Sequence, residues 1–229
     1  MVAPHNRRHV LAELRLNATV GSIMRWYGRL ADIAGISYSS GLGVHRTRLP
    51  NHNLKPEIQH YDFGGRRQEY LSWNYRDGTS SSASPAKNWE SQPLPEDVAP
   101  EAILHHLYEV LELPGEASDY HFAIQGCFER LWGQRRVHPW VMGEIEKLCW
   151  LDIRLLEVLP DTLRHQQTDG TFFYARSIAF ERLIQMYERN GYLAEALDVA
   201  QRATHFHADE TILKPLRERL ARLEAEHDS

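Results

Sequence analysis

Histidine is the residue type in this chain with the clearest capacity for chemistry, because thirteen are present and a neutral imidazole is a common metal ligand. His205, His207 and Asp209 form an HxHxD pattern, which can hold both imidazoles on one side of a metal when it follows a β-strand. Here the pattern follows a predicted helix, on which side chains two positions apart diverge. We therefore expect a solvated helix end, where histidine also suits the helix dipole, rather than a metal site.

A second group of potential ligands lies where the hydrophobic periodicity is weak. His52 and His60 occur near Glu57 and Asp62, and imidazoles together with carboxylates can hold a metal ion. No regular element fixes their geometry in the sequence, so we predict neither a metal site nor a cofactor. A metal-dependent enzyme stays open as the second alternative function.

The chain contains no recognisable motif for nucleophilic catalysis. The sequence contains no GxSxG, no CxxC and no GxxxxGK[ST] pattern. Cys127 and Cys149 fall on the apolar faces of predicted helices, which is typical of small core residues rather than of reactive thiols. We predict no catalytic residue, and the sequence does not favour an enzyme.

The first 95 residues combine arginines with aromatic residues, a composition typical of surfaces that grip single-stranded nucleic acid. The arginines would contact phosphates while the aromatic rings stack on bases. The opposing interpretation, which the sequence favours, is that the aromatic residues form a small core and the arginines dock on the acidic remainder of the chain. The arginines of the nucleic-acid alternative are Arg25, Arg29, Arg46, Arg48, Arg66 and Arg67.

Residues 30–37 also resemble the first helix and the turn of a helix-turn-helix motif, with small residues where close packing needs them. The second helix of that motif is not supported. Gly41 and Gly43 fall inside the would-be recognition helix, where a glycine costs about 1 kcal/mol.

The charge of the chain divides it into two regions. Residues 1–95 contain 12 basic and 7 acidic side chains, whereas residues 96–229 contain 14 basic and 24 acidic ones. A Ser/Pro-rich stretch near residues 77–100 has little to bury and is predicted to be a surface loop or linker. We therefore predict a basic, aromatic-rich region over 1–95 and an acidic helical domain over 96–229.

Hydrophobic periodicity predicts a mainly α protein. One helix is expected over Val10–Ala34, followed by a mixed or irregular region with short extended segments at Val44–Leu49, Ile58–Phe63 and Tyr70–Tyr75. The helices expected after that region are Pro100–Leu113, Ser118–Gln134, Trp140–Leu159, two helices between Tyr174 and Phe206 that Gly191 separates, and Asp209–Glu226.

The stretch Ser177–Glu210 is similar to a tetratricopeptide repeat, a helical hairpin of about 34 residues. The residues that carry the resemblance are Phe180, Leu183, Tyr187, Gly191, Ala196 and Ala203, and the departures are Ile184, Ala200 and Ala208. Residues 119–160 resemble a diverged, lengthened repeat, and the helix over Asp209–Glu226 suits a cap. The resemblance implies a concave groove that binds a peptide or protein. The polar residues expected to line it are Arg176, Glu181, Gln185 and Glu188.

The expected function is that of a scaffold which binds a protein or peptide partner through a helical groove. Binding of nucleic acid by residues 1–95 is the first alternative function. The sequence also allows the chain to form an oligomer. No apolar run approaches the roughly 18 residues of a membrane span, two cysteines cannot form a disulfide framework, and the first residues do not read as a secretory signal. We expect a cytoplasmic protein with no membrane partner.

Overall fold

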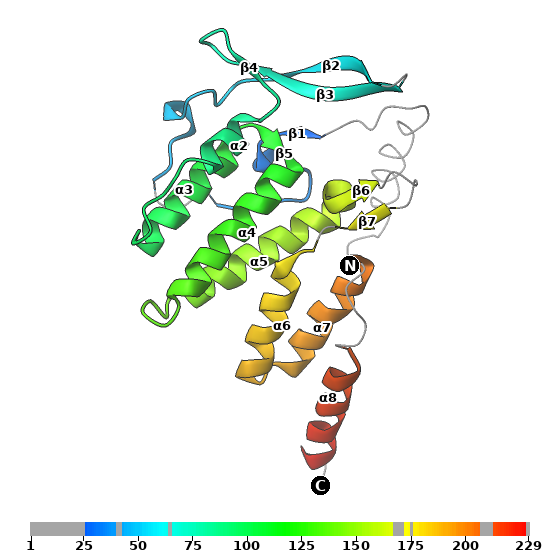
Figure 1. The fold of residues 1–229 in the computed structure, drawn as a ribbon. Helices are drawn as coiled ribbons and strands as arrows, with labels where there is room; N and C mark the ends of the chain where they lie inside the picture. The colour runs from blue at the N-terminus through cyan, green and yellow to red at the C-terminus, as the bar shows by residue number, and fades with distance from the viewer. Residues whose placement is uncertain are drawn as a thin grey trace, which may run out of the picture.

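The computed structural model describes residues 26–39, 43–63, 66–166, 172–174, 176–206 and 213–227, and its architecture is mainly α. The helices follow one another as antiparallel neighbours along the chain, and a narrow β-ribbon lies apart from them (Figure 1). The α-helices are α2 (Pro85–Glu90), α3 (Pro100–Glu112), α4 (Ala117–Gln134), α5 (Val141–Val158), α6 (Ile178–Asn190), α7 (Leu193–Ala203) and α8 (Leu213–His227).

The strands form three small antiparallel sheets among the described residues. In the largest sheet β2 pairs with β3, and the end of β3 pairs with β4. The strands are β1 (Tyr27–Gly28), β2 (Pro56–Phe63), β3 (Arg66–Asn74), β4 (Ser80–Ser81), β5 (Gly115–Glu116), β6 (Arg164–Gln166) and β7 (Phe172–Tyr174). The 3-10 turns are η1 (Leu30–Asp32), η2 (Arg46–Arg48), η3 (Pro160–Leu163) and η4 (Thr204–Phe206).

The helical half confirms the sequence prediction closely. The described helices α3, α4 and α5 coincide with the predicted ones to within one residue at their ends. The predicted pair between Tyr174 and Phe206 is shorter than predicted, because Tyr174 lies in β7, α6 starts at Ile178 and α7 ends at Ala203. α8 covers the described part of the predicted terminal helix. Gly191 ends α6 in the left-handed conformation (φ 83°), which a side chain would strain, so the predicted stop between the two helices is confirmed. Pro100 occupies the first turn of α3, where its missing N–H costs nothing.

The two central hairpins, α4–α5 and α6–α7, stack with α4 and α6 running in the same direction. The Gln125 side chain accepts a hydrogen bond from Ile178 N (3.2 Å), and Arg182 donates two hydrogen bonds to the Glu129 carboxylate (2.6 and 2.8 Å). Both contacts join residues 53 positions apart. A constant offset along two helices means that they are parallel and in a fixed register.

The prediction for the first residues was wrong where the structure describes them. The predicted helix over Val10–Ala34 lies outside the described residues up to residue 25, and residues 26–34 form β1 and the turn η1 instead. The predicted extended segment Val44–Leu49 contains the turn η2. The extended segments predicted at Ile58–Phe63 and Tyr70–Tyr75 are confirmed, because they fall almost wholly in β2 and β3.

The segment predicted to be a loop or linker contains β4 and α2. Ser84 caps α2 by accepting a hydrogen bond from Lys87 N (3.0 Å), and Ala86 is fully buried. The indole of Trp89 donates to Glu109 on α3 (3.0 Å). A short helix with an N-cap and two anchors into the core therefore fixes this part of the chain.

One hydrophobic core joins the helices to the segment that precedes them. Leu30, Ile33, Ile36 and Leu49 belong to the same buried cluster as the inner faces of the helices α3 to α8. Cys127 and Cys149 are buried in it as predicted, and burial raises the pKa of both thiols. Among the described residues, no helix has the length and apolar character needed to cross a membrane.

A buried polar pair joins the two helices of the α4–α5 hairpin inside this core, beside the start of α6. His121 on α4 and Asp152 on α5 are fully buried, with Nδ1 of the imidazole 2.6 Å from a carboxylate oxygen. Ser177, at the start of α6, lies 3.4 Å from the other oxygen of Asp152. Burial outweighs these hydrogen bonds and raises the pKa of the Asp152 carboxyl above its usual value. Three helices therefore meet at one carboxyl group.

We expect His121→Ala to lower the free energy of unfolding by about 3–5 kcal/mol, because it leaves the Asp152 carboxyl buried without its closest partner. Urea denaturation measures this loss. His105→Ala is the matched control, since His105 also faces a glutamate but has a side chain that is 42% exposed, and it should cost less than about 0.5 kcal/mol. The double variant His121→Leu/Asp152→Leu should regain much of the stability, and a loss below about 1 kcal/mol for His121→Ala would contradict the role of the pair.

Candidate binding cleft

A cleft of about 650 Å³ opens between α5, α3 and the extended segment 37–39. This volume falls within the usual range of ligand-binding pockets. Its lining mixes three aromatic side chains with charged groups of both signs. The residues that line it are Ser37, Tyr38, Ser39, Tyr108, Glu144, Glu146, Lys147, Leu148, Trp150, Leu151 and Arg154.

The α5 side of the cleft follows from the helical period. Glu144, Lys147, Leu151 and Arg154 recur at spacings of three and four, so they share one face of α5. The opposite face carries fully buried residues such as Ile145 and packs into the core. The cleft therefore lies on the outer face of a helix whose position the core fixes.

Trp150 in the cleft is held by the second hairpin. Its indole N–H donates to the Tyr187 hydroxyl (2.9 Å), which in turn donates to Glu146 (2.6 Å). The guanidinium of Arg202 on α7 lies 5.5 Å from the Trp150 ring centre, within cation–π range. The Tyr187 ring also meets that of Tyr192 edge to face at 6.4 Å. The orientation of Trp150 thus depends on α6 and α7.

Burial and the hydrogen bond to Glu146 raise the pKa of Tyr187 to about 12. Burial also raises the pKa of Tyr108, and burial together with Glu112 raises that of Tyr38. All three phenols are therefore neutral at physiological pH. The Tyr108 hydroxyl makes no hydrogen bond to another described residue, so it can donate to or accept from a ligand.

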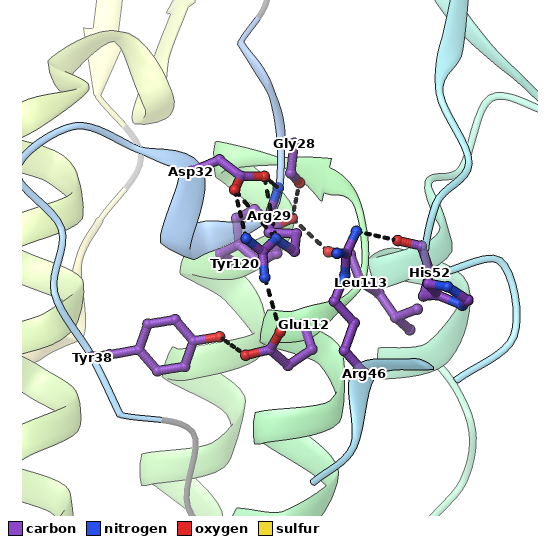
Figure 2. Close-up of polar contacts among 9 residues, drawn as sticks. All are labelled: Gly28, Arg29, Asp32, Tyr38, Arg46, His52, Glu112, Leu113 and Tyr120. Atoms are coloured by element: carbon purple, nitrogen blue, oxygen red, sulfur yellow. Dashed lines mark hydrogen bonds and ion pairs between the residues drawn. The ribbon is translucent and has the colours of Figure 1, made fainter. Parts of the chain in front are cut away.

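The opposite wall of the cleft is held by one carboxylate, Glu112 at the end of α3. Tyr38 donates its hydroxyl proton to Glu112 (2.7 Å), and the Arg29 guanidinium binds the other oxygen of Glu112 (3.3 Å) and also Asp32 (2.9 Å). Figure 2 shows Tyr38 and Arg29 reaching Glu112 from two sides. Arg154 adds a hydrogen bond to the Gly35 carbonyl (3.3 Å). The chain between Arg29 and Tyr38 thus makes hydrogen bonds with both α3 and α5.

Further contacts fix the chain around this wall. The Tyr120 hydroxyl on α4 lies within hydrogen-bonding distance of the carbonyls of Gly28 and Leu113, which joins β1 to the end of α3 (Figure 2). Arg46 donates to the His52 carbonyl (2.8 Å). This network explains how a segment without regular structure can form a fixed wall.

The charged groups of the cleft all have partners within the protein. Lys147 binds Glu144 (2.8 Å) and is largely exposed, so it is accessible to a ligand. Arg154 binds Glu157 (3.4 Å) beside its contact with the Gly35 carbonyl. Exposed pairs of this kind contribute little to stability and exchange partners at little cost. The cleft can therefore offer either charge to a ligand.

The four residues predicted to line a groove lie outside this cleft. Arg176 and Glu181 form an exposed ion pair with each other (2.5 Å), and Glu188 faces Arg219 of α8 (3.7 Å). Gln185 is half-buried on α6. Their role in partner binding stays a prediction.

The arginines of the nucleic-acid alternative take different positions. Arg29 is engaged by Asp32 and Glu112, and Arg46 is half-buried against the chain, so both hold the fold together. Arg48 is exposed. Arg25 lies outside the described residues, and Arg66 and Arg67 are placed only by their strand positions, opposite Phe63 and Asp62.

The histidines singled out as potential metal ligands do not come together in the described part of the chain. His205 ends up in η4, whereas His207 and Asp209 lie outside the described residues. His52 faces the Leu49 carbonyl (2.9 Å), and His60 faces Glu69 across the ribbon (3.4 Å). Within the described ranges, no group of three or more histidine, cysteine, aspartate or glutamate residues is arranged to hold a metal ion.

Sequence reasoning missed the cleft because its walls come from three separate segments. Tyr38 lies in a stretch without periodicity, Tyr108 on α3, and Trp150 on α5 among residues that read as core. One signal was available: the face of α5 with Glu144, Lys147 and Arg154 also carries Leu151, an apolar residue on a polar stripe.

Comparison of the chain with protein-family models, with curated proteins and with solved structures finds no match.

We expect Tyr187→Phe to lower the free energy of unfolding by about 1 kcal/mol near pH 9, because it removes the hydroxyl between Trp150 and Glu146. The folded phenol has a pKa of about 12, against about 10 for the unfolded one, so its stabilisation is complete below pH 10 and is lost as the pH rises toward 12. Urea titrations at rising pH should therefore show the difference between wild type and Tyr187→Phe narrowing over that window.

Tyr192→Phe is the matched control, because the exposed Tyr192 hydroxyl makes no hydrogen bond to a described residue. It should follow the wild type at every pH. A difference between wild type and Tyr187→Phe that stays constant across the window would contradict the raised pKa.

Proposed function

We propose that the chain is an interaction module that binds an extended segment of a partner protein in the α5 cleft. The observation that carries this proposal is the cleft itself, with Tyr38, Tyr108 and Trp150 around an opening lined by lysine, arginine and glutamate. Aromatic residues and arginine dominate the energetics of protein interfaces. The occupant has an apolar side chain for the aromatic walls and polar groups for the charged rim.

The stacked hairpins support a scaffold role of this kind. We propose that α4–α5 and α6–α7 act as tetratricopeptide-like units and α8 as their cap, because each hairpin buries its apolar face against the next. The parallel register of α4 and α6 supports this proposal. Such arrays present rigid side chains to a partner, which reduces the entropy lost on binding.

The test starts from a library of random 12-residue peptides displayed on phage and selected on the full chain. Peptides that bind in the cleft should lose at least about tenfold in affinity, or about 1.4 kcal/mol, for the variants Lys147→Glu and Leu151→Ala, as measured by isothermal titration calorimetry. Lys214→Glu is the matched control, since Lys214 is also an exposed helix lysine beside a glutamate. Failure to select any peptide, or selected peptides that bind these variants as well as the wild type, would refute the proposal.

Binding of nucleic acid is the second candidate, and a specific observation favours it. Lys55 directly precedes β2 and Arg76 follows β3, so both lie at the base of the β-ribbon. Together with Arg48 of η2 they are exposed and form no ion pair with a described residue. The ribbon also exposes Tyr61 and Tyr70, which meet edge to face at 5.6 Å. Such groups can contact phosphates and stack on bases.

Fluorescence anisotropy with labelled single-stranded DNA and RNA tests this candidate. The affinity of the wild type should fall steeply as the salt concentration rises. At a given salt concentration, the double variant Arg48→Ala/Arg76→Ala should bind more weakly than the wild type, and its affinity should depend less on salt. The exposed pair Arg217→Ala/Arg222→Ala on α8 is the control. Absence of binding at low salt would exclude this candidate.

A further inference from the structure

The α5 cleft has the length of a short extended peptide. Glu144 and Arg154, the first and last residues that α5 contributes to its lining, lie ten positions apart. At 1.5 Å per residue, this part of the helix measures about 15 Å. A segment in the polyproline II conformation rises about 3.1 Å per residue, so about five of its residues would span the cleft along α5.

The three aromatic rings of the cleft are separate from one another. Tyr38 comes from the extended segment 37–39, Tyr108 from α3 and Trp150 from α5. Each ring packs partly against the hydrophobic core, and none of the three makes a ring contact with another. They therefore form distinct apolar surfaces, each partly exposed. A ligand that covers all three must present flat apolar groups at intervals.

Two of the rings are oriented before any ligand binds. The Tyr38 hydroxyl donates to Glu112 (2.7 Å; Figure 2), and the Trp150 indole N–H donates to Tyr187 (2.9 Å). These polar groups are already used within the protein, so the ring faces are what the two side chains offer to a ligand. Ordered rings lose little entropy when they bind.

The two cations of the cleft have N–H groups to spare. A lysine ammonium carries three N–H groups and an arginine guanidinium five. Among the described residues, Lys147 binds Glu144 (2.8 Å), and Arg154 binds Glu157 (3.4 Å) and the Gly35 carbonyl (3.3 Å). The remaining N–H groups of both side chains can donate to a ligand.

The acceptors of the cleft are more fully used than its donors. Glu144 accepts a hydrogen bond from Lys147 (2.8 Å), and Glu146 accepts one from Tyr187 (2.6 Å). The Tyr108 hydroxyl makes no hydrogen bond to another described residue, so it adds a further donor. A ligand with many carbonyl groups and few N–H groups suits this balance.

We propose that the α5 cleft binds a proline-rich segment of the partner in the polyproline II conformation. This inference rests on the function proposed for the cleft and specifies its partner. Proline has no N–H group, and polyproline II has no internal hydrogen bonds, so such a segment presents carbonyl acceptors and few donors. Its three residues per turn place prolines three positions apart on one edge, where they would pack on Tyr38, Tyr108 and Trp150. The carbonyls would accept hydrogen bonds from Tyr108, Lys147 and Arg154.

Other peptide conformations suit the cleft less well. A partner helix uses its backbone carbonyls internally and so brings few acceptors. A partner strand needs backbone groups to pair with, but those of α3 and α5 are bonded within the helices, and the segment 37–39 is only three residues long. A polyproline II segment is also ordered before it binds, which lowers the entropy lost on binding.

The probe is a fluorescein-labelled 12-residue peptide of Pro-Pro-Ala repeats, and its binding to the full chain is measured by fluorescence anisotropy. The matched control is the same peptide made from D-amino acids, which has the same composition and hydrophobicity but winds in the opposite hand. The D-peptide should bind at least about tenfold more weakly than the L-peptide.

Two variants place the L-peptide in the cleft. Tyr108→Phe keeps the ring but removes a free hydroxyl, so it should weaken binding about threefold to tenfold. Leu151→Ala should weaken binding at least about tenfold. Tyr27→Phe is the matched control, since Tyr27 is 41% exposed and lies outside the cleft. Tyr108→Phe alters only a hydroxyl without a described partner, so it should keep the wild-type melting temperature within a few degrees.

Three results would overturn the inference: no binding of the L-peptide, equal binding of the L- and D-peptides, or binding that neither Tyr108→Phe nor Leu151→Ala weakens. The function proposed for the cleft can stand when this inference fails. Selected phage peptides that lack proline and lose affinity in Leu151→Ala would support a peptide-binding cleft and contradict its preference for proline. Selected peptides rich in proline that lose affinity in Tyr108→Phe would support both.

Discussion

The arrangement of the helices depends on the buried contact between His121 and Asp152, because it joins the two helices of the α4–α5 hairpin at a carboxyl group that the start of α6 also approaches. α4 supplies the imidazole, α5 the carboxylate, and Ser177 brings the start of α6 to the same point. A buried pair of this kind adds little net stability by itself, but any other packing would leave its groups unpaired. The hydrophobic contacts between hairpins supply energy, and the pair restricts how the helices can slide.

The helices that meet at this junction also carry other contacts. Glu129 of α4 binds Arg182 of α6, and the outer face of α5 forms one wall of the cleft. Glu112 has a corresponding role for the segment from Arg29 to Tyr38, because it binds the side chains of both residues. Asp152 and Glu112 thus each hold two side chains in place, the first inside the core and the second beside the cleft.

The helical half was predictable from the sequence because local signals determine it. Apolar residues at spacings of three and four, a proline at the start of α3 and Gly191 after α6 define helices without reference to tertiary contacts. The first region was not predictable in this way. Residues 26–34 have a helical spacing of apolar side chains, yet Tyr27 and Gly28 pair with residues of β5 that lie 89 and 87 positions further along the chain. The cleft was missed for the same reason, since Tyr38, Tyr108 and Trp150 meet only through tertiary packing.

Tyr187 is the side chain that the cleft and the hairpin turns have in common. Its hydroxyl fixes Trp150 in the cleft, and its ring supports Tyr192 in the α6–α7 turn. Any partner that changes the preferred orientation of Trp150 therefore acts on a residue that also shapes the turn. Coupling of this kind is reciprocal, so a change in the packing of Tyr192 on Tyr187 would also act on the orientation of Trp150.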